Sequence, residues 1–146
     1  VVDYDKAIEL DPAYADAFAA RGALGIVRGR YDAAGADLDK ALELDPENAV
    51  AAIHRARLLA ACPDESLRDG PRAIELADRA CSLVHGENLH ALQALAAAFA
   101  ESDRFDEAVE WQTKALALAK TLDDQNKAKA RLELYRRHEP LRDPAP

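Results

Sequence analysis

The sequence predicts an all-α protein built from repeated helical units, because its composition, an internal repeat and its prolines all point to that fold class. Its 146 residues include 33 Ala and 19 Leu but only 12 Val, Ile and Thr residues together, a bias toward helix formers and away from strand formers. The segment Ala7–Pro12 recurs, with one conservative change, as Ala41–Pro46, at an offset of 34 residues. Repeat proteins show periods of about 20 to 50 residues. We therefore expect a stack of similar helix pairs.

Eight helices are expected, in order, at about residues 1–10, 14–28, 31–44, 48–61, 71–84, 88–101, 105–119 and 123–137. The first and the third end before Pro12 and Pro46, since the residue before a proline avoids the helical region. Residues 62–71 contain two prolines and a glycine, which stop one helix and delay the next. This segment is expected to be a loop inserted within a repeat, and it is either a functional loop or a tolerated insertion.

A second motif, aromatic-Asp-x-Ala, marks the start of two of these helices. Tyr31–Ala34 returns as Phe105–Ala108 after 74 residues, which is two repeat lengths plus six. The intervening copy has Ala73 at the matching place of its second helix, and five of the six additional residues precede it. The five-residue excess therefore lies within the 62–71 loop, and the sixth residue follows Ala73.

With helix-turn-helix units of 34 residues, small residues at fixed places and a terminal Leu-x-Leu-Asp-Pro, the chain resembles the tetratricopeptide repeat family. The most complete unit, residues 15–48, has the signature residues Phe18, Gly22, Tyr31, Ala34, Leu38, Ala41 and Pro46. The resemblance implies a right-handed α-solenoid of antiparallel helix pairs, in which small side chains let neighbouring helices approach closely.

The resemblance also divides the chain into segments. Residues 1–12 are expected to form the second helix of a truncated preceding repeat, 13–48 a repeat, 49–88 a repeat with the inserted loop 62–71, 89–120 a repeat, 121–139 a C-terminal capping helix and 140–146 a tail. The tail is rich in proline and is expected to be frayed or extended.

The expected capping helix is amphipathic. Ala128, Leu132 and Tyr135 form a stripe at i, i+4 and i+7 that would cover the end of the last repeat. The rest of its surface is basic and comprises Lys127, Lys129, Arg131, Arg136 and Arg137. A membrane-active basic face is the alternative to a solvated cap.

Charge and cysteine content limit the classes of partner and compartment. Lys and Arg number 19 against 27 Asp and Glu, a formal charge of −8, which argues against nucleic acid as a partner. No apolar run approaches the ~20 residues of a spanning helix, so no membrane association is expected. The N-terminus shows no export signal. Cys62 and Cys81 lack the spacing of a zinc site and are expected to be buried free thiols, which favours a cytoplasmic location.

No pattern of residues predicts catalysis, a metal site or a cofactor. The short motifs of nucleotide-binding loops, zinc proteases and serine hydrolases are missing from the sequence. Asp37 and Asp39 are expected on a solvated helix face. His54 and Cys62 would lie about 12 Å apart along one helix, too far for a base and its nucleophile. We therefore expect a protein that is not an enzyme.

The resemblance implies a binding surface on the first helix of each repeat, where family members hold an extended peptide or a partner helix. Carried over position by position, this groove is expected to include Ala19, Ala23, Ile26, Val50, Ile53, Arg57, His90, Gln93, Ala97 and Glu101. Some family members hold a terminal carboxylate with Lys and Asn where this chain has Ala19 and Ala23, so that clamp is not expected. Arg57 would either meet a ligand carboxylate or pair with a nearby acid such as Glu101.

The expected function is a non-enzymatic scaffold or adaptor module that binds a protein or peptide in this concave groove. One alternative is a structural or oligomerisation element, because the open N-terminal end bears the apolar residues Val1, Val2, Tyr4 and Ile8. Another is a regulatory segment of a larger multidomain protein. Fold alone does not identify the partner.

Overall fold

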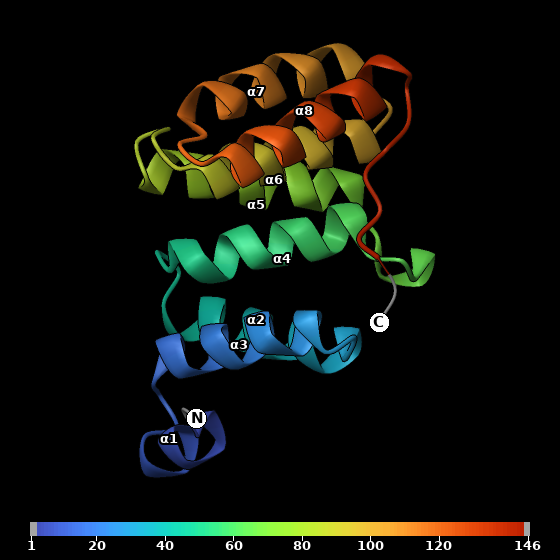
Figure 1. The fold of residues 1–146 in the computed structure, drawn as a ribbon. Helices are drawn as coiled ribbons and strands as arrows, with labels where there is room; N and C mark the ends of the chain where they lie inside the picture. The colour runs from blue at the N-terminus through green and yellow to red at the C-terminus, as the bar shows by residue number, and fades with distance from the viewer. Residues whose placement is uncertain (1–2, 145–146) are drawn as a thin grey trace.

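The computed structural model describes residues 3–144, and its α-helices confirm the all-α fold (Figure 1). In chain order they are α1 (Tyr4–Leu10), α2 (Ala15–Val27), α3 (Tyr31–Leu44), α4 (Ala49–Ala61), α5 (Gly70–Leu83), α6 (Leu89–Glu101), α7 (Phe105–Leu118) and α8 (Leu122–Arg136). The ends of the predicted helices differ from these by no more than three residues. A short 3-10 turn, η1 (Glu65–Leu67), lies between α4 and α5 and was not predicted.

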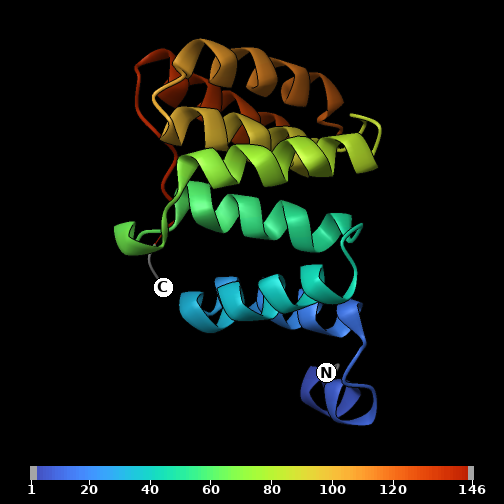
Figure 2. The ribbon, with the colours of Figure 1, turned by 180° about the vertical axis from the view of Figure 1, so that it is seen from behind.

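The helices form two layers. Helices α2, α4, α6 and α8 lie on one side, and α3, α5 and α7 lie behind them, as the two opposite views show (Figure 1, Figure 2). Each helix packs on its partner in the pair, and α4 also packs against α3 and α6 of the neighbouring pairs. The result is an α-solenoid in which α1 lies at one end and α7 and α8 at the other.

Polar residues and two turns define where the helices begin. Asn48 caps α4 by accepting a hydrogen bond from the backbone N–H of Ala51, and Asn88 caps α6 in the same way. The α2–α3 turn needs a residue in the left-handed backbone conformation, and Gly29 provides it with φ of 70°. Asp103 takes the same place before α7 with φ of 58°, because Asp tolerates this conformation better than most other residues.

Small residues hold the paired helices close together. Ala34 and Ala41 on α3, like Ala108 and Ala115 on α7, are almost fully buried and lie seven residues apart on one helix face. At Gly22 a Cβ atom would lie only 2.7 Å from Cγ of Leu38. The contact between α2 and α3 therefore leaves no room for a methyl group at this position.

Two arginines join successive helices across the layers. Nε and Nη2 of Arg21 on α2 donate to the two carboxylate oxygens of Asp37 on α3, at 2.8 and 2.6 Å. Arg55 on α4 donates to both oxygens of Asp39 at 2.9 Å. The two acids were expected on a solvated face, and that expectation is wrong because each forms a partly buried, bidentate ion pair.

The inserted loop is tied to the end of α6. Nη1 of Arg68 donates to the backbone oxygen of Cys62 at 2.8 Å, and its Nε lies 3.1 Å from Oε1 of Glu101. Gly70 begins α5 against Ser102, whose hydroxyl oxygen would lie 2.3 Å from an added Cβ atom. The base of the loop is therefore packed, while Glu65 in its 3-10 turn is exposed.

Helix α8 packs against α7. Ala128, Leu132 and Tyr135 are buried, and the buried side-chain amide of Gln112 donates to the backbone oxygen of Ala128 at 3.1 Å. Arg131 departs from the expected solvated basic face, because it is half-buried and turned toward α4 and α6. Within residues 3–144, no helix combines the length and the apolar character needed to cross a membrane.

The tail was expected to be frayed or extended, and residues 140–144 are extended but not frayed. They run back along the molecule to the end of α4, where the backbone N–H of Asp143 donates to the backbone oxygen of Ala61 at 2.8 Å (Figure 1). Just before this segment, the ring of His138 stacks on Phe105 at 5.0 Å between centroids. The last two residues of the tail lie outside the described range.

Enlarging a small residue between paired helices should destabilise the fold. Ala115→Leu adds three carbon atoms at a fully buried position of α7, so we expect the free energy of unfolding to fall by about 1–3 kcal/mol. Ala117→Leu on the exposed face of the same helix is the control and should change it by less than about 0.5 kcal/mol. Urea unfolding followed by circular dichroism measures both, and equal effects would contradict the close packing described above.

Candidate functional site

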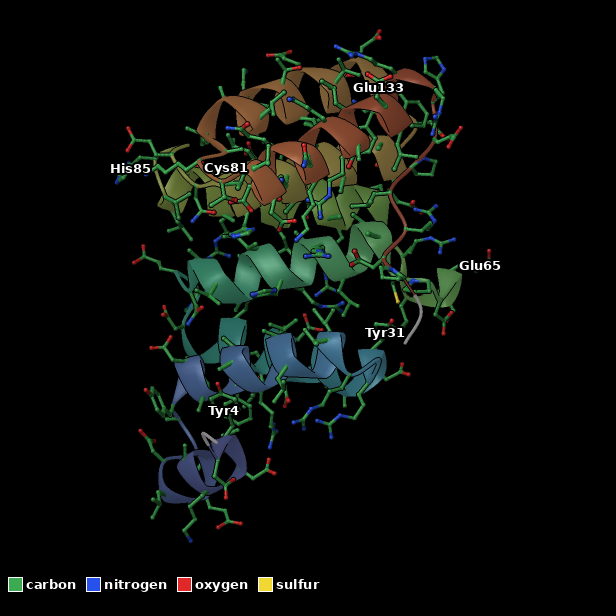
Figure 3. All side chains as sticks on the ribbon, viewed as in Figure 1. Tyr4, Tyr31, Glu65, Cys81, His85 and Glu133 are labelled. Atoms are coloured by element: carbon green, nitrogen blue, oxygen red, sulfur yellow. The ribbon has the colours of Figure 1, made fainter. Side chains whose placement is uncertain are left out.

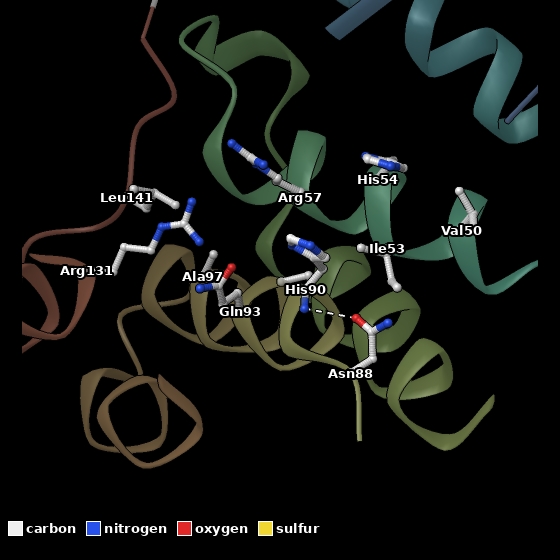
Figure 4. A pocket seen from close by; sticks show the side chains of 11 residues that line it. Val50, Ile53, His54, Arg57, Asn88, His90, Gln93, Ala97, Arg131 and Leu141 are labelled. Carbon is white, nitrogen blue, oxygen red and sulfur yellow. Dashed lines mark hydrogen bonds between the residues drawn. The ribbon is translucent and has the colours of Figure 1, made fainter. Parts of the chain in front are cut away.

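A cavity of about 280 Å³ opens between α4, α6 and α8 (Figure 4). Helix α4 supplies one wall and α6 the other, while α8 and the tail close one end. Its lining comprises Val50, Ile53, His54, Arg57, Asn88, His90, Gln93, Ala94, Ala97, Arg131 and Leu141. The cavity is therefore built from two repeats, the capping helix and the tail.

Six of the ten residues expected in the groove line this cavity. They are Val50, Ile53 and Arg57 on α4 and His90, Gln93 and Ala97 on α6. Val50 and His90 are exposed at the rim, whereas Ile53, Gln93 and Ala97 are at most 8% exposed. Equivalent positions of the two repeats are thus brought together.

The other four expected residues lie elsewhere. Ala19 is buried in the cluster that joins α2 to α3, and Ala23 and Ile26 on the same helix are half-buried outside the cavity. Glu101 lies at the end of α6, where it pairs with Arg68 and with Nη1 of Arg142 at 2.6 Å. The first complete repeat therefore adds no residue to this cavity.

Five lining residues were missed by the sequence analysis. His54 shares the i, i+4, i+7 stripe of Val50 and Arg57, and Ala94 lies between His90 and Ala97 in the same way, so helical periodicity contains the signal for both. Asn88 was missed although it caps α6. Arg131 and Leu141 come from α8 and the tail, and the repeat pattern says nothing about where these segments return.

The tail provides the ion-pair partner of Arg57. Nε of Arg57 lies 3.0 Å from Oδ2 of Asp143 and Nη2 lies 2.6 Å from Oδ1, so the pair is bidentate. Arg57 thus pairs with an acid of the chain, which was one of the two expectations, but this acid is Asp143. Glu101, the acid named as the example, is instead paired with Arg68 and Arg142. Asp143 is 12% exposed at its side chain, so this ion pair is partly shielded from water.

The remaining charge around the cavity is positive. Arg131 is half-buried and forms no ion pair with any residue of the 3–144 range. Burial lowers the pKa of its guanidinium group, and the positive charge of Arg57 lowers it further. None of the described residues that line the cavity is acidic. The cavity is thus a cationic site on a chain with a formal charge of −8.

His54 is a second shielded basic group in the cavity. Burial lowers its pKa from the ordinary value, with smaller contributions from the charges of Arg57 and His90. Its imidazole is therefore neutral near neutral pH, and only acidification would add its charge to the site.

The two cysteine thiols are poor nucleophiles near neutral pH. Burial raises the pKa of the Cys81 thiol to about 11 and also raises that of Cys62, so both thiols stay protonated near neutral pH. Both are free and buried, as expected. In the described part of the chain, no three His, Cys, Asp or Glu side chains converge in a way that could hold a metal ion.

Comparison with known proteins supports the helical-repeat architecture. A profile described as "Tetratricopeptide repeat" matches residues 16–48 and 89–122. The crystal structure of MamA superposes with a TM-score of 0.66 at 17% identity, covering 92% of this chain and 84% of that one. The first TPR domain of the human RPAP3 protein, solved by NMR, gives 0.64 at 21% identity, covering 86% and 98%. At such identities the likeness concerns the fold alone. A search of curated sequences finds no match.

The shifted pKa of His54 predicts how stability depends on pH. Below about pH 6.5 the unfolded chain takes up a proton at His54 that the folded chain resists, so the free energy of unfolding should fall as the pH drops. His54→Gln should lessen the fall between about pH 7.5 and about pH 5.5, measured by urea unfolding. His85→Gln, at an exposed histidine, is the control, and an identical pH dependence in the wild type and His54→Gln would argue against a shielded imidazole.

Proposed function

Because the chain belongs to the tetratricopeptide repeat family, we propose that it is a non-enzymatic interaction module that binds an extended peptide or a partner helix in the cavity between α4 and α6. Repeats of this family are generally non-enzymatic scaffolds for protein–protein interaction. The proposal assigns that general role to one surface of this chain.

The observation that carries the proposal is the cavity itself. Its floor is apolar, from Ile53, Ala94 and Ala97, and it also has a few polar side chains such as His90 and Arg57, which is the usual composition of a site that orients a ligand. Val50 at the rim is 53% exposed although it is a large apolar side chain. Burial of this side chain by a ligand would contribute to binding.

The electrostatics favour a protein over a nucleic acid as the ligand. A formal charge of −8 repels a phosphate backbone over the whole surface, and a single cationic cavity suits one carboxylate better than a row of phosphates. The two free, buried cysteines fit a reducing compartment such as the cytoplasm.

Substitution at the rim tests this function. Peptides selected from a displayed library on the wild-type chain should bind Val50→Glu at least tenfold more weakly, a loss of about 1.4 kcal/mol, because the substitution replaces an apolar contact with a charge. Leu122→Glu, at an exposed apolar residue outside the cavity, is the control. Titration calorimetry measures both affinities. Selected peptides that bind all three proteins equally would remove the cavity from the proposal.

A second candidate function is self-association through the N-terminal end. Leu10 of α1 is 76% exposed and Tyr14 after it is 47% exposed, so this end presents apolar surface. Tyr4 and Ile8 are half-buried on α1, and Val1 and Val2 lie outside the described residues.

Light scattering distinguishes the second candidate from the first. If the N-terminal end associates, the molar mass should rise with concentration in the wild type, and Leu10→Glu should shift the protein toward monomer because it places a charge in the contact. A mass that equals the monomer at every concentration would exclude this candidate and leave peptide binding unaffected.

A further inference from the structure

The tail of the chain closes one end of the cavity to which the proposed function assigns the partner. Leu141 lines the cavity and packs against an apolar cluster formed by α4, α5 and α6. Two residues later, Asp143 accepts both hydrogen bonds of the Arg57 guanidinium group. Figure 4 shows Leu141, Arg57 and Arg131 around the same opening.

The backbone of the tail is held as well. The last carbonyl groups of a helix have no partner within it, and in α4 the oxygen of Ala61 accepts from the backbone N–H of Asp143 at 2.8 Å. The side chain of Arg142 donates to the oxygen of Ala60 at 3.4 Å and pairs with Glu101. One apolar side chain, one carboxylate and one backbone hydrogen bond are the contacts by which an extended peptide ligand is recognised.

The tail neutralises one of the two arginines at the cavity and not the other. It neutralises Arg57, but Arg131 has no ion pair within residues 3–144, and no described lining residue is acidic. At physiological ionic strength charges are screened beyond about 8 Å, so these two arginines outweigh the distant acidic surface for a ligand inside the cavity. A partner segment with a second carboxylate would therefore gain an ion pair that the tail lacks.

We propose that the cavity recognises an extended acidic segment of a partner protein, in which an apolar side chain replaces Leu141 and carboxylates pair with Arg57 and Arg131. Residues 141–143 of the tail hold this site until such a segment displaces them. This inference rests on the proposed function and adds to it the chemistry of the partner and a means of regulation.

Covalent attachment sets how strongly the tail competes. A short flexible connection keeps such a segment at an effective concentration of roughly millimolar near its site. A partner that binds the open site with micromolar affinity would therefore bind the closed site much more weakly, and releasing the tail would restore its affinity.

The full-length chain with the double substitution Leu141→Ser and Asp143→Asn provides the open state. The probe is a fluorescent heptapeptide with the sequence of residues 138–144, HEPLRDP, followed by fluorescence anisotropy. The probe should bind the open variant at least tenfold more tightly than it binds the wild type. Glu139→Gln is the matched control and should bind the probe as the wild type does, because Glu139 is exposed and pairs with Arg137, away from the cavity lining.

Two further substitutions locate the contacts. A probe with Asn in place of its Asp should lose at least tenfold in affinity for the open variant, because it cannot form the ion pair with Arg57. Arg131→Gln in the open variant should weaken an acidic probe, HEDLRDP, by a larger factor than it weakens HEPLRDP. The added carboxylate directly precedes the leucine that lines the cavity with Arg131, and the probe keeps the arginine that pairs with Glu101.

The proposal fails if the folded open variant and the wild type bind HEPLRDP equally, or if neither binds it. If the double substitution prevents folding, hydrogen exchange in the wild type decides instead. Unlabelled HEPLRDP at about 10 mM, above the effective concentration of the tail, should speed exchange of the Asp143 amide, and the Asn-containing peptide should not. An unchanged exchange rate would overturn the proposal.

The outcomes also separate this inference from the proposed function. Selected peptides that depend on Val50 but bind the wild type and the open variant equally would leave the interaction role standing and remove the tail's role. Failure of every peptide to bind either protein would remove both.

Discussion

The close approach of paired helices is the constraint on which the rest of this structure depends. Where α2 meets α3, a glycine at position 22 faces Leu38, and alanines such as Ala34 and Ala41 leave space for only a methyl group at each contact. Each such contact buries little apolar area, so the pairs are stable only because neighbouring pairs continue the same packing. The same close packing brings α4 and α6 near enough for their equivalent residues to form one cavity.

Ion pairs connect the helices at places where little apolar area is buried. Arg21 and Arg55 each bind an aspartate of α3 through two hydrogen bonds, and Arg68 and Arg142 share Glu101 at the end of α6. Paired, partly buried guanidinium groups suit these positions because their planar geometry matches a carboxylate. Arg131 departs from this arrangement, because it is half-buried and forms no ion pair within residues 3–144.

Features that follow a local sequence pattern could be predicted, whereas contacts between distant segments of the chain could not. The helices follow from periodicity and prolines, and Val50, Ile53, Arg57, His90, Gln93 and Ala97 were placed by their equivalence within repeats. Ala19, Ala23 and Ile26 are equivalent by the same criterion but lie outside the cavity, since it is closed by α8 and the tail, which are found only at the other end of the array. Asp143 reaches Arg57 across 86 residues of sequence, and no local pattern encodes a contact of that range.

The return of the tail to α4 also changes the topology of the array. A solenoid whose repeats touch only their neighbours can open stepwise from its ends, because losing a terminal helix breaks one interface. Here Asp143 is anchored to α4, so α8 cannot detach from α7 independently while that anchor persists. The region from α4 to α8 is thereby closed into a ring of contacts, in which opening α8 also requires release of the tail.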